Sequence, residues 1–406
     1  MTGHIHHHPN YNQMEQVVVI DAMRTPIGAF GGALKPLSAP DLGAVTIGAL
    51  FKTNGLNPDL IEEVVMGNVL SAGLGQAPGR QAALKAGLKN TTPCCTVDKV
   101  GASGIKAVIY AMQQIQTGDT RLMVAGGMES MSNVPHYMSD ARFGVSLGHS
   151  RMVDGIIRDG LWDVFKKFYM GNAAELCART YGITRDQQDE YAMESCHRAI
   201  EARDQGAFDS EIATVKVRNR RGKADVISRD EETDRVDFTK LQKLAPAFEK
   251  DGTVTTANTA PLNDGAAALL LMSESKAMEL GIPPVARLVS HASAAQAPEW
   301  YTTTASIAIS RALDRADKSV EDMDLLEINE DFAVVSLVNA ELLKADLQKV
   351  NIHGGAIGLG HPLGCSGARI LVTLIHALRR YDKQWGCAGI SNGGGGASAM
   401  VIERLS

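Results

Sequence analysis

Short apolar runs alternate with segments of helical periodicity over the first 130 residues. EQVVVIDAMRTPIG contains a Val/Ile run followed by a polar break, which is typical of a buried strand. A helix is expected over residues 39–50, with Asp41 near its start, followed by a second short strand in EEVVMGNVL. Strands that alternate with helices imply parallel pairing, so this part of the chain predicts an α/β architecture.

The chain also contains a weak internal similarity. SGIKAVIYAMQQIQTGDTRLMVAGG in the first half has the same order of features as SGARILVTLIHALRRYDKQWGCAGISNGG in the second. Each begins a helix with Ser-Gly and continues through a polar turn and an apolar strand to paired glycines. The similarity indicates two related halves, although chance likeness between α/β units would give the same pattern.

The pattern changes between about residues 130 and 250, where aromatic, methionine and charged residues mix. ITRDQQDEYAMESCHRAIEARDQGAF predicts a long amphipathic helix, with Thr184 as its cap and Gln187 as the capping-box partner. We interpret this stretch as an insertion of loops and helices. The α/β pattern resumes at GTVTTANTAPLNDGAAALLLMSE and continues to the end of the chain.

Composition narrows the class of protein. A length of 406 residues indicates two or more packed domains, and 45% hydrophobic with 21% charged residues is ordinary for a globular protein. The net charge of -6 and the lack of a long apolar run argue against nucleic-acid and membrane partners. The polar segment 1–13 lacks a signal-peptide core and is expected to be a disordered or tag-like tail.

Cysteine usage favours a reduced, cytoplasmic protein without a metal site. The spacing shows neither a secreted disulfide framework nor CxxC metal-ligand pairs. The cysteines are Cys94, Cys95, Cys177, Cys196, Cys365 and Cys387.

Candidate chemistry is concentrated in four segments that carry polar residues, three of which are rich in glycine. They are KVGASG, EINEDFA, GGAIGLGHPLGCSGAR and ISNGGGGASAM. Glycine clusters of this kind allow close approach of backbone to backbone or ligand. A generic nucleotide-binding protein is disfavoured, because no GxGxxG follows the first strand and no Walker sequence is present.

These segments, with GGMESMS, resemble motifs of the thiolase family, and the likeness runs from about Val17 to Glu403 in the family's order. The resemblance implies two similar α-β halves in a layered α-β-α-β-α core, with an inserted loop domain. It divides the chain into an N-terminal half (14–129, completed by 251–284), a loop domain (130–250) and a C-terminal half (285–406). Related proteins are dimers or tetramers, so a homodimer or homotetramer is expected.

The resemblance also implies a reaction, namely Claisen condensation or thiolysis on acetyl-CoA and acetoacetyl-CoA. In the family a cysteine thiolate accepts the acyl group, the histidine of the GHP motif activates that thiol, and a second cysteine acts as general base. That histidine is His361. Two oxyanion holes are implied: a first oxyanion hole from Asn329, through a water, with His361, and a second from backbone N–H groups at Gly101 and Gly393.

The chain departs from the family at both cysteines. KVCASG has become KVGASG, which places Gly101 at the nucleophile position, and CNGGGG has become SNGGGG, which places Ser391 at the general-base position. Glycine has nothing to acylate, and a serine hydroxyl is too weakly acidic without an activating partner. Cys387 is four residues from Ser391, more than about 13 Å along a strand, and is not expected to substitute for it.

Further departures bear on the origin of these changes. Ala260 stands where the family has a coenzyme-A-contacting serine, NEAF has become NEDF with Asp331, and Tyr169 replaces a common histidine. Removal of a nucleophile by design would not require these changes, so natural divergence is favoured over an engineered trap.

Coenzyme A thioesters are the implied substrates, and no bound cofactor is expected. Cations of VKVRNRRGKADV would meet the phosphates, although such a run is also typical of a solvated face. Met170 and Phe332 match residues beside the pantetheine arm, with core filling as the alternative for each. The predicted binding residues are Met170, Arg218, Arg220, Arg221, Ala260 and Phe332.

Two functions of different class remain open. The chain is a thiolase-type acyltransferase that is inactive or altered, for example one that decarboxylates or hydrolyses acyl-CoA without covalent catalysis through His361, Asn329 and Asp331. Alternatively, it is a non-catalytic acyl-CoA-binding scaffold or a partner subunit of an active thiolase or synthase.

Overall fold

The protein is described from a computed structural model that covers residues 14–145, 147–218, 222–239 and 243–406. Its centre is one sheet in the order β14-β15-β16-β13-β1-β12-β5-β3-β4, with β2 paired to β12. The strands of this sheet are β1 (Val17–Arg24), β2 (Gly28–Ala29), β3 (Glu63–Gly67), β4 (Cys94–Val97), β5 (Leu122–Ser130), β12 (Asn263–Ser273), β13 (Ala286–Ala295), β14 (Leu325–Ile328), β15 (Trp385–Asn392) and β16 (Gly396–Arg404).

Two halves of the sheet meet at a short junction between β1 and β13. Only Val17–Val19 pair there, antiparallel to Ala286–Leu288. In the first half β3 runs parallel to β5, which is followed by antiparallel β12 and β1. In the second half β14 runs parallel to β15, followed by antiparallel β16 and β13. The same sequence of pairings occurs twice, so the predicted pair of similar halves is confirmed.

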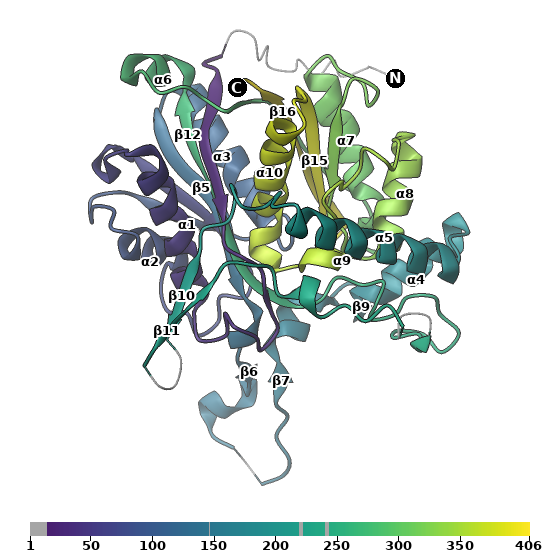
Figure 1. Ribbon diagram of the computed structural model, residues 1–406. Helices are drawn as coiled ribbons and strands as arrows, with labels where there is room; N and C mark the ends of the chain where they lie inside the picture. The colour runs from purple at the N-terminus through teal and green to yellow at the C-terminus, as the bar shows by residue number, and fades with distance from the viewer. Residues whose placement is uncertain (1–13, 146, 219–221, 240–242) are drawn as a thin grey trace, which may run out of the picture.

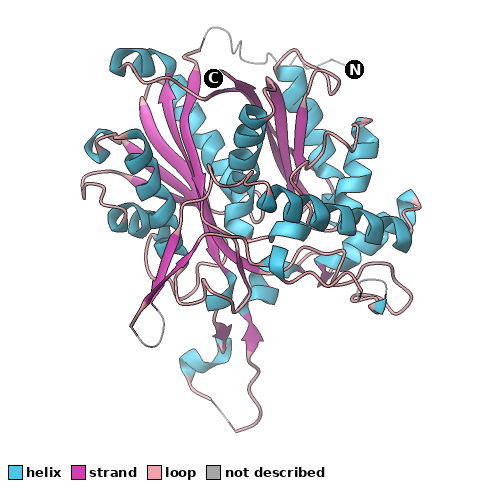
Figure 2. Cartoon of the chain, viewed as in Figure 1, coloured by secondary structure: helices cyan, strands magenta, loops and turns pink. Residues whose placement is uncertain are grey.

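Helices form layers around and between these two halves (Figures 1 and 2). α3 and α10 pack against each other between the halves, α1 and α2 cover the first half, and α7 packs on the second beside α8. The predicted α-β-α-β-α layering is therefore present. The helices are α1 (Ala39–Asn54), α2 (Pro78–Lys85), α3 (Ser103–Thr117), α4 (Met170–Tyr181), α5 (Arg185–Asp204), α6 (Glu274–Leu280), α7 (Thr304–Arg315), α8 (Ala333–Leu343), α9 (Ala356–Leu359) and α10 (Leu363–Arg380).

Close packing of α3 on α10 depends on glycine. A Cβ on Gly104 would lie 2.7 Å from the backbone nitrogen of Ala368, and one on Gly367 would lie 2.6 Å from the backbone nitrogen of Ile105. Real Cβ atoms do not approach backbone this closely, so glycine sets the separation of the two helices. The loops that precede these two helices are thereby brought together.

Capping boxes form at the starts of two helices, of which the sequence analysis predicted the one at α5. Ser38 and Asp41 make a reciprocal capping box at α1, which extends beyond the expected 39–50 and ends at Gly55 with a φ of 59°. Thr184 and Gln187 make the predicted capping box at α5. Local sequence therefore determines where both helices begin.

The region from residue 130 to 250 lies around one end of the layered core (Figure 1). It holds α4, α5 and short hairpins, of which the β6–β7 hairpin projects away from the core. The hairpin strands are β6 (His136–Tyr137), β7 (Val153–Asp154), β8 (Trp162–Asp163), β9 (Phe168–Tyr169), β10 (Val215–Arg218) and β11 (Ala224–Ile227). Across the described residues, no helix combines the length and apolarity needed to cross a membrane.

Candidate active site

Loops from both halves converge on a small cavity of about 70 Å³, here called the inner cavity. Gly101 lies just before α3, His361 just before α10, and Ser391 near the end of β15. The segment 329–331 follows β14. Among the predicted site residues and Asp331, those that line the inner cavity are Gly101, Met170, Ala260, Asp331, Phe332, His361, Ser391 and Gly393.

The nucleophile position has room for a side chain directed at the histidine. A Cβ on Gly101 would lie 3.8 Å from His361 Nε2 and 3.4 Å from the Ser391 carbonyl oxygen, which are ordinary contact distances. The preceding Val100 has a φ of 49°, a left-handed conformation that is costly for a β-branched residue. The turn at the predicted nucleophile position is therefore strained, and Gly101 supplies no side chain there.

His361 is fixed at both ring nitrogens. Its Nδ1 lies 2.6 Å from Ser366 Oγ, and its Nε2 lies 2.9 Å from Asp331 Oδ1. A carboxylate can only accept, so Nε2 carries the proton in its contact with ionised Asp331. Ser366 Oγ also lies 2.9 Å from the Pro362 carbonyl oxygen. Its hydroxyl can donate to Nδ1 of a neutral ring. Beside a charged ring, it can accept from Nδ1–H and donate to the Pro362 carbonyl oxygen. In both cases Nε2–H donates to Asp331.

A second donor reaches the same carboxylate oxygen. Asn329 Nδ2 donates to Asp331 Oδ1 at 2.8 Å. Asp331 Oδ2 is buried and has no hydrogen-bond partner among the described residues. Asn329 and His361 are the side chains that family resemblance assigns to the first oxyanion hole. Asp331 Oδ1 therefore contacts both side chains of that hole, in which the resemblance assigns His361 a direct role and Asn329 a role through a water.

Neither remaining candidate supplies the missing thiol. Ser391 is buried, and its Oγ has no hydrogen-bond partner within the described chain, so no base activates it. Cys387 lies in the core beside α7, and burial raises the pKa of its thiol to about 12. No cysteine lines the inner cavity in the part of the chain described here. As predicted, Cys387 does not substitute for the residue at position 391.

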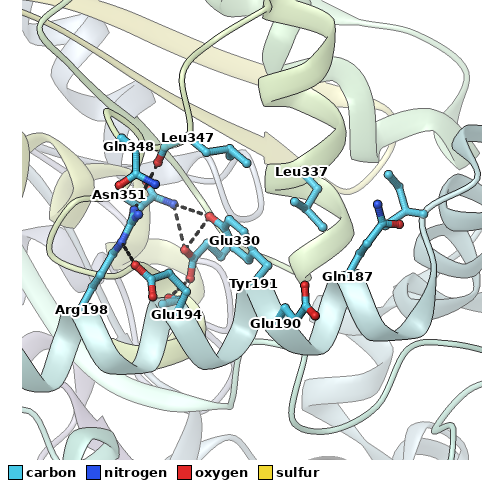
Figure 3. A pocket seen from close by; sticks show the side chains of 12 residues that line it. Gln187, Glu190, Tyr191, Glu194, Arg198, Glu330, Leu337, Leu347, Gln348 and Asn351 are labelled. Atoms are coloured by element: carbon cyan, nitrogen blue, oxygen red, sulfur yellow. Dashed lines mark hydrogen bonds and ion pairs between the residues drawn. The ribbon is translucent and has the colours of Figure 1, made fainter.

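Glu330 anchors the segment that carries Asp331. It is fully buried beneath a separate cavity of about 410 Å³ on the α5 side (Figure 3). Its carboxylate accepts from Tyr191 Oη at 2.9 Å, Ser195 Oγ at 2.7 Å and Asn351 Nδ2 at 2.9 Å. These contacts from α5 and the loop after α8 fix the backbone of the neighbouring Asp331.

An outer cavity of about 600 Å³ adjoins the inner one. The two share Val100, Gly160, Met170 and Gly393 in their linings, so they lie side by side. Arg158 lines the outer cavity, a cation that the sequence analysis missed because it lies outside the basic run it considered. Asp98 and two further aspartates line the same cavity, so its charge is mixed.

Of the predicted phosphate-binding arginines, only Arg218 lies within the described residues. Arg218 is exposed on β10, whose Val215 and Val217 pack into the apolar cluster under α1, and it does not line either cavity. Arg220 and Arg221 lie outside the described residues. No group of three His, Cys, Asp or Glu side chains in the described ranges is arranged to hold a metal ion.

The layered fold has two similar α/β halves, with the site where loops from both halves meet. The models for the thiolase N-terminal and C-terminal domains match residues 17–275 and 282–404, so the chain belongs to the thiolase family. It is 50% identical to acetyl-CoA acetyltransferase 2 of Arabidopsis thaliana over 391 residues, covering 96% of this chain and 97% of that protein. It is 47% identical to the probable acetyl-CoA acetyltransferase of Dictyostelium discoideum, covering 97% and 95% respectively.

Solved structures show the same relationship. The Bacillus anthracis acetyl-CoA acetyltransferase superposes with a TM-score of 0.94 at 40% identity, covering 97% of this chain and 99% of the other. The Acat5 thiolase of Ascaris suum in complex with coenzyme A gives 0.91 at 42% identity, covering 96% and 100%. Both similarities extend over almost the whole chain.

Proposed function

We propose that this chain binds short-chain acyl-CoA thioesters in the inner and outer cavities and no longer transfers acyl groups through an acyl-enzyme. The main observation behind this proposal is the space at Gly101. A Cβ added there would lie 3.8 Å from His361 Nε2. Thiolase-type condensation and thiolysis both require a nucleophile at that point. Without it, the acyl-enzyme step is lost while the surrounding pocket is retained.

The size and shape of the cavities support this substrate class. The inner cavity of about 70 Å³ accommodates an acyl group of only a few carbons. The adjoining outer cavity offers a route for an extended pantetheine-like arm, lined by Met170. One related structure is described as a complex with coenzyme A. These features favour acetyl-CoA or acetoacetyl-CoA over long-chain substrates.

Calorimetric titration with coenzyme A, beside a thiolysis assay with acetoacetyl-CoA, tests the proposal. Binding without thiolysis above the buffer rate is expected. Gly393→Leu should weaken binding at least tenfold, because its side chain would fill the space shared by the two cavities next to Met170. Gly48→Leu is the matched control, since nothing lies within 4 Å of a Cβ there. Failure to bind coenzyme A, or efficient thiolysis, would contradict the proposal.

A non-catalytic scaffold or partner subunit would also bind acyl-CoA but would not turn it over. Coenzyme A binding with no reaction of any short acyl-CoA would favour that alternative. We also propose a homodimer or homotetramer located in the cytoplasm, in line with the family resemblance. Analytical ultracentrifugation and localisation of the tagged full chain test these two points.

A further inference from the structure

We propose that Asp331 is the general base of a hydrolytic reaction, in which it activates a water molecule held in the space left by the missing thiol. This inference rests on the proposed function, because it requires an acyl-CoA thioester in the inner cavity. It adds a reaction, a nucleophile and a catalytic residue. Three features of the site support it: the occupied first oxyanion hole, the free carboxylate oxygen and the retained second oxyanion hole.

The occupied first oxyanion hole argues against chemistry through a thioester enolate. Asp331 Oδ1 accepts from Asn329 Nδ2 at 2.8 Å and from His361 Nε2 at 2.9 Å. An enolate oxygen bound there would have to displace an ionised carboxylate oxygen or lie beside it. Two like charges at contact distance in a buried site repel strongly. Condensation and decarboxylation both need that enolate, whereas hydrolysis does not.

The geometry of Asp331 suits a base. Two N–H donors hold Oδ1 and fix the orientation of the side chain, which is only 12% exposed. Oδ2 is buried and has no hydrogen-bond partner among the described residues, so a water that reaches it would be its first partner. Asp331 and Gly101 line the same inner cavity. In the proposed reaction the attacking water lies in that cavity between the two residues.

By resemblance, the second oxyanion hole consists of backbone N–H groups at Gly101 and Gly393, and both residues line the inner cavity. A side-chain substitution does not remove a backbone N–H group. In the hydrolytic step, the water oxygen bonds to the acyl carbon and its proton passes to Asp331. The tetrahedral oxyanion is stabilised at the two backbone donors. The carbon–sulfur bond then breaks, and the departing sulfur takes the proton from Asp331. The products are a carboxylic acid and free coenzyme A, and water is the only co-reactant.

The experiment uses the full chain with acetyl-CoA or acetoacetyl-CoA and no added coenzyme A. A thiol reagent detects the coenzyme A that hydrolysis releases. Asp331→Asn keeps the size of the side chain and removes the base. Its kcat is expected to fall at least about 100-fold, the usual lower range for a general base. Its affinity for coenzyme A, measured by calorimetry, should remain within a few-fold. Asp314→Asn, an exposed aspartate on α7, serves as the control with unchanged kcat.

The outcomes separate this inference from the function on which it rests. If the wild-type chain binds coenzyme A and releases none from either thioester above the buffer rate, the hydrolytic inference is overturned and the binding proposal stands. Equal turnover by wild type and Asp331→Asn also overturns it. If Asp331→Asn shows an altered circular dichroism spectrum, Asp331→Ala replaces it in the same comparison. Absence of coenzyme A binding by the wild type rejects the proposed function itself.

Discussion

At the scale of single residues, three positions account for the altered site. By family resemblance, Gly101 and Ser391 stand at the positions of the two groups used for acyl and proton transfer. Asp331 places a carboxylate oxygen between Asn329 and His361, at 2.8 and 2.9 Å. The first two changes remove reactive groups, whereas the third occupies a binding position. Restoration of the thiols alone therefore leaves the first oxyanion hole filled.

We predict that a Gly101→Cys, Ser391→Cys variant stays poor at thiolysis of acetoacetyl-CoA. Adding Asp331→Ala should raise its kcat at least about 100-fold, in the range measured when an oxyanion-hole donor is restored. A thiol at position 101 fits sterically, since its Cβ makes only ordinary contacts. Thioester absorbance gives the rates. Equal rates for the double and triple variants would show that Asp331 does not obstruct the hole.

Glu330 offers a separate test of positioning. Its carboxylate accepts from Tyr191 and Asn351 (Figure 3). It also accepts from Ser195, and it holds the backbone next to Asp331. Glu330→Gln should lower the kcat for thioester hydrolysis by about tenfold through misplacement of Asp331, with little change in KM. Steady-state kinetics measure the two parameters separately. A rise in KM with unchanged kcat would indicate a binding role instead.

At the scale of elements, the site depends on how α3 and α10 approach each other. Both helices begin directly after a site loop, and glycines let them pack at backbone contact. The sequence predicted both helices from their Ser-Gly starts. It did not predict that they pack on each other, because that contact joins positions more than 250 residues apart.

Gly104→Ala should lower the free energy of unfolding by about 1–3 kcal/mol, because its Cβ would lie 2.7 Å from the Ala368 backbone nitrogen. Gly48→Ala in α1 is the control. Nothing lies within 4 Å of a Cβ there, so it should be neutral or stabilise by up to about 1 kcal/mol. Urea denaturation measures both. Equal effects of the two substitutions would contradict the packing argument.

Glu129, at the end of β5, accepts from the backbone N–H groups of Val69 and Leu70 and from that of Gly364 in the first turn of α10. Burial raises the pKa of this carboxyl to about 7. Between its unfolded pKa near 4.5 and about 7, the folded state binds more protons than the unfolded state. The contribution of Glu129 to stability therefore falls as the pH rises through that window.

Glu129→Gln should remove this component, on the order of 2 kcal/mol, from the loss of stability between pH 5 and pH 8. Urea unfolding at the two pH values gives the difference for each protein. Glu327, whose pKa burial raises to about 8, contributes equally to both proteins and cancels in the comparison. An identical pH dependence in the variant would refute the assignment to Glu129.

At the scale of the whole molecule, a buried ionic cluster ties the region 130–250 to the core. Arg24 at the end of β1 contacts Glu211 at 2.5 Å and Asp230 at 2.7 Å, and all three side chains are almost completely buried. Arg24→Met should cost about 3–5 kcal/mol, because it leaves two carboxylates buried without their cation. Chemical denaturation monitors the loss. A change below 1 kcal/mol would exclude a structural role for the cluster.

The sequence predicted this architecture well where the signals are local. The Val/Ile run of β1 and the Thr184–Gln187 cap of α5 depend on neighbouring residues, and both are present. The site loops were identified from their glycine motifs. The contact of Asp331 with His361 could not be predicted, because it depends on the conformations of two loops from distant segments. The place of Arg158 in the outer cavity is a tertiary feature of the same kind.

Native mass spectrometry of the full chain with acetyl-CoA, followed by denaturation of the same sample, tests the central claim most directly. The account predicts a complex with acetyl-CoA or coenzyme A that dissociates completely on denaturation and leaves the mass of the unmodified protein. A protein that retains an acetyl group after denaturation would contradict the loss of the acyl-enzyme step. A protein that forms no complex would contradict the binding site itself.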